Sequence, residues 1–391
     1  MALLFITLFN SILGLSILFP IIGPLARELG LTEFQTGLFS TAYAFMQFLM
    51  SPYWGRMSER WGRKPVLMLG ILGFGVSFFL FAFVAQLRLA GVLDVGTTFW
   101  LLLLARLLGG ALSSATLPTA QAYVADVTGR ADRTSGMALI GAAFGLGVIL
   151  GPGIGGLLAK LHLLAPVYFS AGLAFFNALF VWLALPEPKR HVHAGPLPVL
   201  RPTDPRVWPL LLTGFAISLA SVAMETTVAF YFQDVLRLDA KDTAAAVATA
   251  LVIYGVVAVF IQGFLVRRFK WPPRVLLDVG LPLAFFGYML FVVSRTFAGL
   301  ASALTLQGAG QGLASPGVTA GLSLAVNENE QGAVAGLNSS AQALGRMLGP
   351  IVGTGLYDAV GPQAPYVFSA ALIFLVWVFL RTPRARAVLS S

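Results

Sequence analysis

The sequence predicts an all-α membrane protein with twelve transmembrane helices in two pseudo-symmetric six-helix bundles. Three observations lead to this fold class. Of the 391 residues, 58% are hydrophobic and 10% are charged, and the mean hydropathy is +0.85, so a soluble fold of this length has no way to hide its apolar surface. The apolar residues form twelve runs of about the ~20 residues that a helix needs to cross a bilayer. A polar, proline-rich stretch divides these runs into six and six.

The twelve apolar runs are joined by short polar connections. The first run starts next to Met1 without a basic leader or a small-residue cleavage site, so we expect a retained helix. The runs cover about residues 2–24, 34–54, 66–87, 98–124, 135–158 and 166–185, then 207–235, 243–266, 275–294, 297–325, 333–357 and 364–381.

Residues 187–206 are predicted to be a cytoplasmic linker. The stretch from Pro186 to Arg206 contains six prolines and shows no helical periodicity. We therefore expect an N-terminal six-helix bundle over residues 1–186 and a C-terminal six-helix bundle with a short cytoplasmic tail over residues 207–391.

The 25 Lys and Arg residues predict the orientation. With a cytoplasmic N-terminus, 17 of them lie in inner loops and the tail, six lie in outer loops, and Arg106 and Arg346 lie inside apolar runs. This bias predicts both termini in the cytoplasm and a multi-pass protein of the inner (cytoplasmic) membrane. The net charge of +9 does not indicate nucleic acid binding, because the basic residues lie where they act on topology and on lipid headgroups.

The residue content of the chain does not indicate an enzyme. The chain has no cysteine, which excludes thiolate metal sites and thiol catalysis. Its histidines, His162, His191 and His193, fall in predicted loops, and we expect no metal and no cofactor. No Gly-rich loop ending in Gly-Lys-Ser or Gly-Lys-Thr occurs, so an ion gradient is the expected energy source of any transport.

The densest charge cluster between two apolar runs extends from Gly55 to Lys64 and predicts a tight turn at the membrane surface. Its order, Gly-x-x-x-acid-Arg-x-Gly-Arg-Lys, resembles the gating loop between the second and third helices of the major facilitator superfamily. The matching residues are Gly55, Glu59, Arg60, Gly62, Arg63 and Lys64, with Glu59 where the family usually has Asp.

The resemblance also predicts two contacts of this loop. Glu59 is expected against the inner N-terminus of the eleventh segment, where free N–H groups favour a carboxylate. Arg63 is expected to pair with Asp126 at the end of the fourth segment.

The fifth segment contains glycines four residues apart, which share one helix face and permit close approach of another helix. Pro152 removes a backbone hydrogen bond there. The run Gly-x-x-x-Gly-Pro-x-x-Gly-Gly looks like the antiporter motif of the drug-efflux branches of the superfamily. It consists of Gly147, Gly151, Pro152, Gly155 and Gly156.

The same glycine motif recurs 198 residues later. Gly345, Gly349 and Gly353 repeat it in the eleventh segment, with Pro350 in place of Pro152. Two related six-helix halves are what an alternating-access transporter needs, since its substrate site lies between repeats.

Charged and polar side chains inside the apolar runs are the candidate site residues. Arg106-x-x-x-Gly110 is similar to the fourth-helix motif of the family, which implies control of proton affinity at a carboxylate. Glu225 is the one acid well inside a run, and Asp278 lies near the inner end of the ninth segment; with Arg106 they are the proton-coupling candidates. Drug antiporters of the family often carry an acid in the first helix, where this chain has Asn10 and Ser11. The candidate cavity residues are Asn10, Ser11, Arg346, Asn338 and Gln342.

These features predict a secondary active transporter that exports lipophilic, drug-like compounds in exchange for protons, as the resemblance implies. Export of a sugar or of a native metabolite such as a siderophore is the alternative, and a membrane receptor that transports nothing is a third. The expected partners are a small-molecule substrate, protons and the lipid bilayer, and we expect a monomer.

Overall fold

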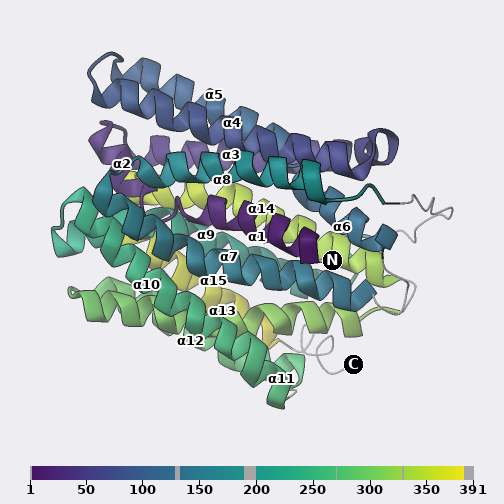
Figure 1. Cartoon of the computed structure of the whole chain (residues 1–391). Coiled ribbons are helices and arrows are strands. Elements are labelled where there is room, and N and C mark those ends of the chain that lie inside the picture. Colours follow the sequence, from purple (N-terminus) through teal and green to yellow (C-terminus); the bar gives the residue numbers. More distant parts are fainter. Residues whose placement is uncertain (1, 128–132, 189–199, 270, 328–329, 383–391) are drawn as a thin grey trace. The chain divides into compact units, whose positions relative to one another are not determined.

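The computed structural model describes residues 2–127, 133–188, 200–269, 271–327 and 330–382, and these form helices joined by short connections without any strand (Figure 1). Most of the predicted linker and the tail from residue 383 lie outside the described residues. The helices of the first half are α1 (Ala2–Ser16), α2 (Ile22–Glu28), α3 (Glu33–Trp61), α4 (Arg63–Leu89), α5 (Val95–Ser113), α6 (Thr116–Val127), α7 (Arg133–Leu161) and α8 (Ala165–Ala184). Those of the second half are α9 (Trp208–Leu236), α10 (Ala240–Phe260), α11 (Val266–Phe269), α12 (Pro273–Val293), α13 (Phe297–Leu324), α14 (Gln331–Ala359) and α15 (Ala364–Leu380).

The helices follow the twelve predicted runs, but three runs are interrupted. The first run is split into α1 and α2 by turns at residues 17–21, where Pro20 cannot continue a helix, and the fourth run is split into α5 and α6. A short π-helical turn, Ile261–Leu265, joins α10 to α11. Six helical spans of the described chain are long and apolar enough to cross a membrane, and α15 and parts of α1 and α7 are shorter apolar helices.

Several helix starts are fixed by local side-chain caps. Thr32 and Gln35 form a reciprocal capping box at the start of α3, since each side chain accepts from the backbone N–H of the other. Asp94 caps α5 and Thr296 caps α13 in the simpler way, by accepting one backbone N–H three residues ahead.

The chain divides into two compact units. Unit 1 contains residues 1–193 and 238–249, and unit 2 contains residues 194–237 and 250–391. The first half of α10 therefore belongs to unit 1 and its second half to unit 2.

In unit 1, the glycine motif of α7 packs against α1. A Cβ atom added at Gly147 would lie 2.9 Å from the backbone nitrogen of Leu13, and one added at Gly151 would lie 3.0 Å from that of Ile17. Ser16 donates a hydrogen bond of 2.7 Å from its Oγ to the carbonyl of Gly147. The shared glycine face predicted from the sequence is thus the α1–α7 contact. Gly156 faces Ala244, in the part of α10 that belongs to the same unit.

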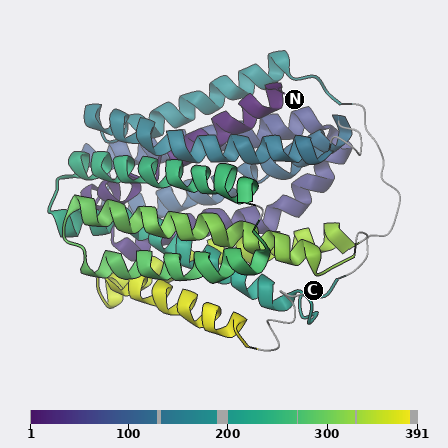
Figure 2. The same ribbon diagram turned by 90° about the horizontal axis from the view of Figure 1, so that it is seen from below.

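In unit 2, the repeated motif of α14 packs against α9. Added Cβ atoms would lie 2.8 Å from the nitrogen of Leu219 at Gly345 and 2.7 Å from the Cα of Ala223 at Gly353. A second close contact joins α12 to α13, where Gly280 and Gly310 lie against each other's backbone. Figure 2 gives a second view of these helices, with α15 in yellow. The two glycine contacts fix which faces of α9 and α13 are turned toward the interior of the unit.

The prediction of a tight turn from Gly55 to Lys64 is wrong. Residues 55–61 continue helix α3, and the chain is interrupted only at Gly62, which has φ 111° and ψ 156° before α4 begins at Arg63. Glycine is the residue that adopts such a positive φ without strain. The charged cluster is therefore a helix end followed by one glycine, and not a loop.

Candidate functional site

Unit 2 contains a partly open, polar cavity of about 170 Å³ between α9, α13 and α14. The tight α9–α14 contact turns one face of α9 toward α13, and side chains of this face form one wall. The cavity is lined by Gly214, Ile217, Ser218, Ser221, Val222, Glu225, Gln311, Ser315, Val318, Gln342 and Arg346. Two opposite charges, Glu225 and Arg346, therefore share one small cavity within an otherwise apolar group of helices.

A hydrogen-bond network extends from Glu225 to α13. Ser221 lies one helical turn before Glu225, and its Oγ is 3.0 Å from Oε1 of Glu225 and 2.9 Å from Oε1 of Gln311. The same Gln311 oxygen accepts from the Tyr254 hydroxyl of α10 at 3.1 Å and from Nε2 of Gln307 at 3.1 Å. Oε1 of Gln311 is thus the common acceptor of the network.

The network continues to α12, and the buried Oε1 of Gln307 has no hydrogen-bond partner among the described residues. Nε2 of Gln307 also donates to the Tyr288 hydroxyl at 3.0 Å, and Gln307 is almost fully buried. At the opposite side of the cavity, Ser218 donates to the backbone carbonyl of Gln342 at 2.8 Å, and Gln342 donates to Oδ1 of Asn338 at 3.2 Å. The polar groups around Glu225 therefore come from five helices of one unit, α9, α10, α12, α13 and α14.

Four residues predicted from the sequence meet here. Glu225, Gln342 and Arg346 line the cavity, and Asn338 is bonded to Gln342. Sequence reasoning missed Ser221, Gln307 and Gln311. Their spacing could have indicated the site. Gln307 and Gln311 are four residues apart in an apolar helix and so share a face, as do Ser221 and Glu225.

Asp278 lies in a different environment. Its side chain is 40% exposed and forms long ion pairs with Arg274 at 3.6 Å and Arg381 at 3.7 Å. The carboxylate is therefore held in a solvent-exposed charge cluster, apart from the cavity residues.

Arg106 of α5 is buried among aromatic rings of unit 1. Its Cζ lies 5.1 Å from the ring centre of Tyr43, 5.3 Å from that of Phe78 and 5.6 Å from that of Phe81. Its Nε is buried without a hydrogen-bond partner, and no carboxylate in the described part of unit 1 forms an ion pair with it. The π faces of the rings are the electrostatic partners of this cation within the unit.

The polar residues of α1 make a small cluster of their own in unit 1. Asn177 of α8 donates from Nδ2 to the carbonyl of Thr7 at 2.9 Å and to Oγ of Ser11 at 3.2 Å. Asn10 precedes Ser11 in the chain and is partly buried. The cluster ties α1 to α8, and it contains no acid.

The end of α3 and the start of α4 are held by two carboxylates. The expected ion pair is present: Nε of Arg63 lies 2.7 Å from Oδ2 of Asp126, and both side chains are less than a tenth exposed. Glu187, which follows α8, accepts from the backbone N–H of Arg63 at 2.6 Å and of Lys64 at 2.8 Å. Sequence reasoning missed Glu187. Its carboxylate caps the N-terminus of α4, while Glu59 is exposed on α3.

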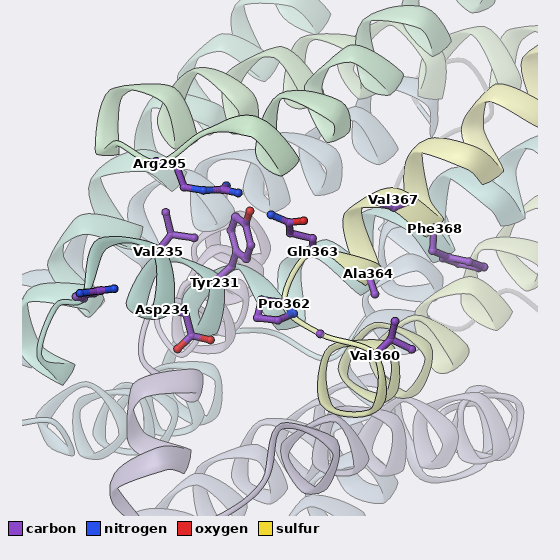
Figure 3. Close-up of a pocket in the computed structure, with 12 residues that line it drawn as sticks. Tyr231, Asp234, Val235, Arg295, Val360, Pro362, Gln363, Ala364, Val367 and Phe368 are labelled. Carbon is purple, nitrogen blue, oxygen red and sulfur yellow. The ribbon is translucent and has the colours of Figure 1, made fainter.

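A larger, mainly apolar hollow of about 830 Å³ lies at another end of unit 2, where α9 meets the start of α15 (Figure 3). Tyr231 donates there to the carbonyl of Phe291 at 2.8 Å, and the side chains of Arg295 and Gln363 point toward the Tyr231 ring. None of the residues predicted from the sequence lines it.

The fold and the buried charges define a multi-pass membrane protein with a polar site among transmembrane helices. The chain belongs to the Major Facilitator Superfamily, whose sequence pattern it matches over residues 4–303 and again over 279–391. It is therefore a membrane transporter and not an enzyme.

Curated relatives at modest identity include drug-resistance proteins. Multidrug resistance protein 1 of Bacillus subtilis is 28% identical over 380 residues, which cover 95% of this chain and 93% of that protein. Quinolone resistance protein NorA of Staphylococcus aureus is 25% identical over 389 residues, with coverage of 96% and 94%.

Solved transporter structures share the fold. A bacterial homologue of the human lysosomal transporter Spinster has a TM-score of 0.76 at 14% identity, over 97% of this chain and 95% of that one. The nucleoside transporter NupG has a TM-score of 0.76 at 12% identity, over 99% of each chain.

Proposed function

We propose that this transporter exports lipophilic, drug-like compounds from the cytoplasm in exchange for protons, by alternating access. The names of two relatives, a multidrug and a quinolone resistance protein, support a drug-like cargo. The repeated glycine contacts in units 1 and 2 support two similar halves, as alternating access requires.

The observation that carries the proposal is the cavity that holds Glu225 with Arg346. An ionisable side chain within a membrane helix costs a few kcal/mol, so it is retained where it serves substrate or ion binding. Glu225 has a hydroxyl partner in Ser221 that can accept from its neutral form and donate to its charged form. We therefore assign proton coupling to Glu225. Asp278 is too exposed for this role, and no carboxylate in the described part of unit 1 pairs with Arg106.

We further propose that both termini are cytoplasmic and that residues 1–186 and 207–391 act as the two moving halves. Glu59, Arg60, Arg63 and Asp126 would then form the inner gate, with the Arg63–Asp126 pair as its fixed side. Replacement of Glu59 by Gln should favour the inward-open state.

The test is transport by the reconstituted protein in vesicles with an imposed pH gradient. Glu225→Gln should bind a fluorescent lipophilic cation as wild type does, exchange it downhill, and fail to concentrate it. Asp278→Asn is the matched control and should still concentrate the dye. If Glu225→Gln accumulates the dye with normal pH dependence, the coupling assignment is wrong. If wild type moves no lipophilic compound but moves a sugar or siderophore, the cargo assignment is wrong, and absence of any transport would indicate a receptor.

A further inference from the structure

The network around Ser221 contains one more acceptor than its hydroxyl proton can serve. Oγ of Ser221 lies within hydrogen-bond distance of Oε1 of Glu225 and of Oε1 of Gln311, and a serine has a single O–H to donate. The arrangement is complete when Glu225 is neutral, because the acid proton is then donated to Ser221 and the Ser221 proton to Gln311.

Ionisation of Glu225 changes this chain of donors. A carboxylate only accepts, so the Ser221 hydroxyl must turn its proton toward Glu225, where the charge-assisted bond is the stronger one. Oε1 of Gln311 then loses one of its three donors and keeps those from Tyr254 and Gln307. The hydrogen bonds of α13 therefore differ between the two protonation states of an acid on α9.

The side chain of Gln311 has a second consequence for the cavity. Its oxygen is engaged by protein donors, whereas its Nε2 donates to no acceptor within the described residues, although Gln311 lines the cavity. The amide N–H groups are thus available to a hydrogen-bond acceptor inside the cavity, such as a carbonyl or ether oxygen of a lipophilic compound.

Other titratable groups near Glu225 come from three neighbouring helices. Arg346 of α14 shares the cavity, and Tyr254 of α10 and Tyr288 of α12 belong to the network. Helix α13 contributes amides and no charge, and Tyr366 of α15 bonds to Thr227 of α9. Among the described residues, Ser221 is the one that is hydrogen-bonded to both Glu225 and Gln311.

We propose that Ser221 and Gln311 are positioning residues that relay the protonation state of Glu225 to a cargo hydrogen bond made by the Gln311 amide. The relay rests on the proposed coupling role of Glu225. It specifies the cargo further, as lipophilic compounds that carry a hydrogen-bond acceptor.

The experiment measures the pH midpoint of gradient-driven dye transport for the full-length protein in vesicles. Ser221→Ala removes the donor to the carboxylate and should raise the midpoint by about one pH unit, the size expected for loss of one hydrogen bond to a charged group. Gln311→Leu removes the competing acceptor of the Ser221 proton and should lower the midpoint. Because Gln311 acts only through Ser221, the double variant should behave as Ser221→Ala alone. Ser221→Thr keeps a hydroxyl and should restore the wild-type midpoint.

The control is Thr213→Val, which removes a buried α9 hydroxyl that bonds only its own helix at Pro209. It should leave the midpoint unchanged. Additive shifts, or wild-type midpoints in both single variants, would overturn the relay even when Glu225→Gln has lost coupling. If Glu225→Gln keeps coupling, the proposed function itself fails. A cargo series with and without a carbonyl group should lose its preference in Gln311→Leu but not in Thr213→Val.

Discussion

The two units contain the same helix contact but place different side chains beside it. In unit 1 the backbone nitrogen of Leu13 faces Gly147, and in unit 2 that of Leu219 faces Gly345. If Leu13 and Leu219 are taken as equivalent, then Ile17 corresponds to Ala223. Ile17 faces Gly155, and Ala223 faces the matching Gly353. The packing register is therefore repeated over the whole contact.

The polar residues beside this contact in unit 2 are not repeated in unit 1. In the same register, Glu225 corresponds to Phe19 and Ser221 to Leu15, while Arg346 corresponds to Val148 in the glycine helix. The glycines set the distance between two backbones. This distance does not depend on which side chains occupy the other faces of the helices. The difference shows that the packing and the chemistry of each unit are specified by separate residues.

The cations of the two units also differ, since Arg106 is buried and Arg346 is exposed. Arg346 shares a cavity with a carboxylate, whereas Arg106 lies among three aromatic rings and pairs with no acid among the described residues of its unit. A buried guanidinium without a carboxylate is stabilised only in part by ring faces. We therefore expect the two arginines to influence transport through different physical effects.

The largest expected effect comes from the shared contact. Gly151→Leu and Gly349→Leu place a branched side chain where a Cβ already meets Ser16 or lies 2.8 Å from Cβ of Val222. Each should abolish dye transport in vesicles while reducing membrane insertion far less, as judged by immunoblot.

Matched controls exist in both units. Gly172 of α8 and Gly336 of α14 have no neighbouring atom within 4 Å of an added Cβ, so Gly172→Leu and Gly336→Leu should transport normally. Normal transport by Gly151→Leu but not by Gly349→Leu would mean that the repeated contact has unequal importance.

A smaller effect should separate the two arginines. Arg346→Gln removes the cation that shares a cavity with Glu225, and should displace the pH midpoint of transport as well as slow it. Arg106→Gln should slow transport without displacing the midpoint. Transport rates measured from pH 5.5 to 8.5 test this difference. An equal displacement of the pH midpoint in both variants would contradict it.

The smallest effect is expected from the exposed ion pairs of unit 2. Arg206 donates to both carboxylate oxygens of Glu330 at 3.0 Å and to Asp204 at 2.9 Å, and its side chain is 43% exposed. These hydrogen bonds hold the pKa of Asp204 and of Glu330 below their ordinary values of 3.8 and 4.5. A lowered carboxyl pKa in the folded state adds stability above the ordinary pKa, which is lost as pH falls through the folded value.

Arg206→Gln should therefore lower the melting temperature at pH 7 by no more than about 2 °C. The difference from wild type should shrink as the pH falls below the ordinary carboxyl pKa values and vanish only below the lowered folded values. Thermal unfolding in detergent at pH 7 and across the acid range measures it. Asp126→Asn, which breaks the buried Arg63–Asp126 pair of unit 1, should lower the melting temperature at pH 7 by more than Arg206→Gln does. If Arg206→Gln lowered the melting temperature more than Asp126→Asn, solvent exposure would not explain how much each ion pair contributes to stability.

Much of the site follows from local sequence, and some of it does not. The glycine faces were predictable because helical spacing fixes them, and the Arg63–Asp126 pair was predictable because the family resemblance implies it. The cap that Glu187 forms on α4 was not, since it brings together residues more than 120 positions apart without any periodic pattern. The same holds for the contact of Tyr254 with Gln311, which depends on how α10 packs beside α13.

The sequence alone determined the all-helical membrane fold, the twelve apolar segments and the two copies of the glycine motif, because length, hydropathy and spacing are properties of one segment at a time. The tertiary structure decided that Glu225 meets Ser221 and Gln311 and shares a cavity with Arg346, that Arg106 faces aromatic rings, and that helix α3 continues through the charged cluster to Trp61. Those outcomes depend on the rotation of each helix about its axis, which is set by contacts with its neighbours and not by its own composition.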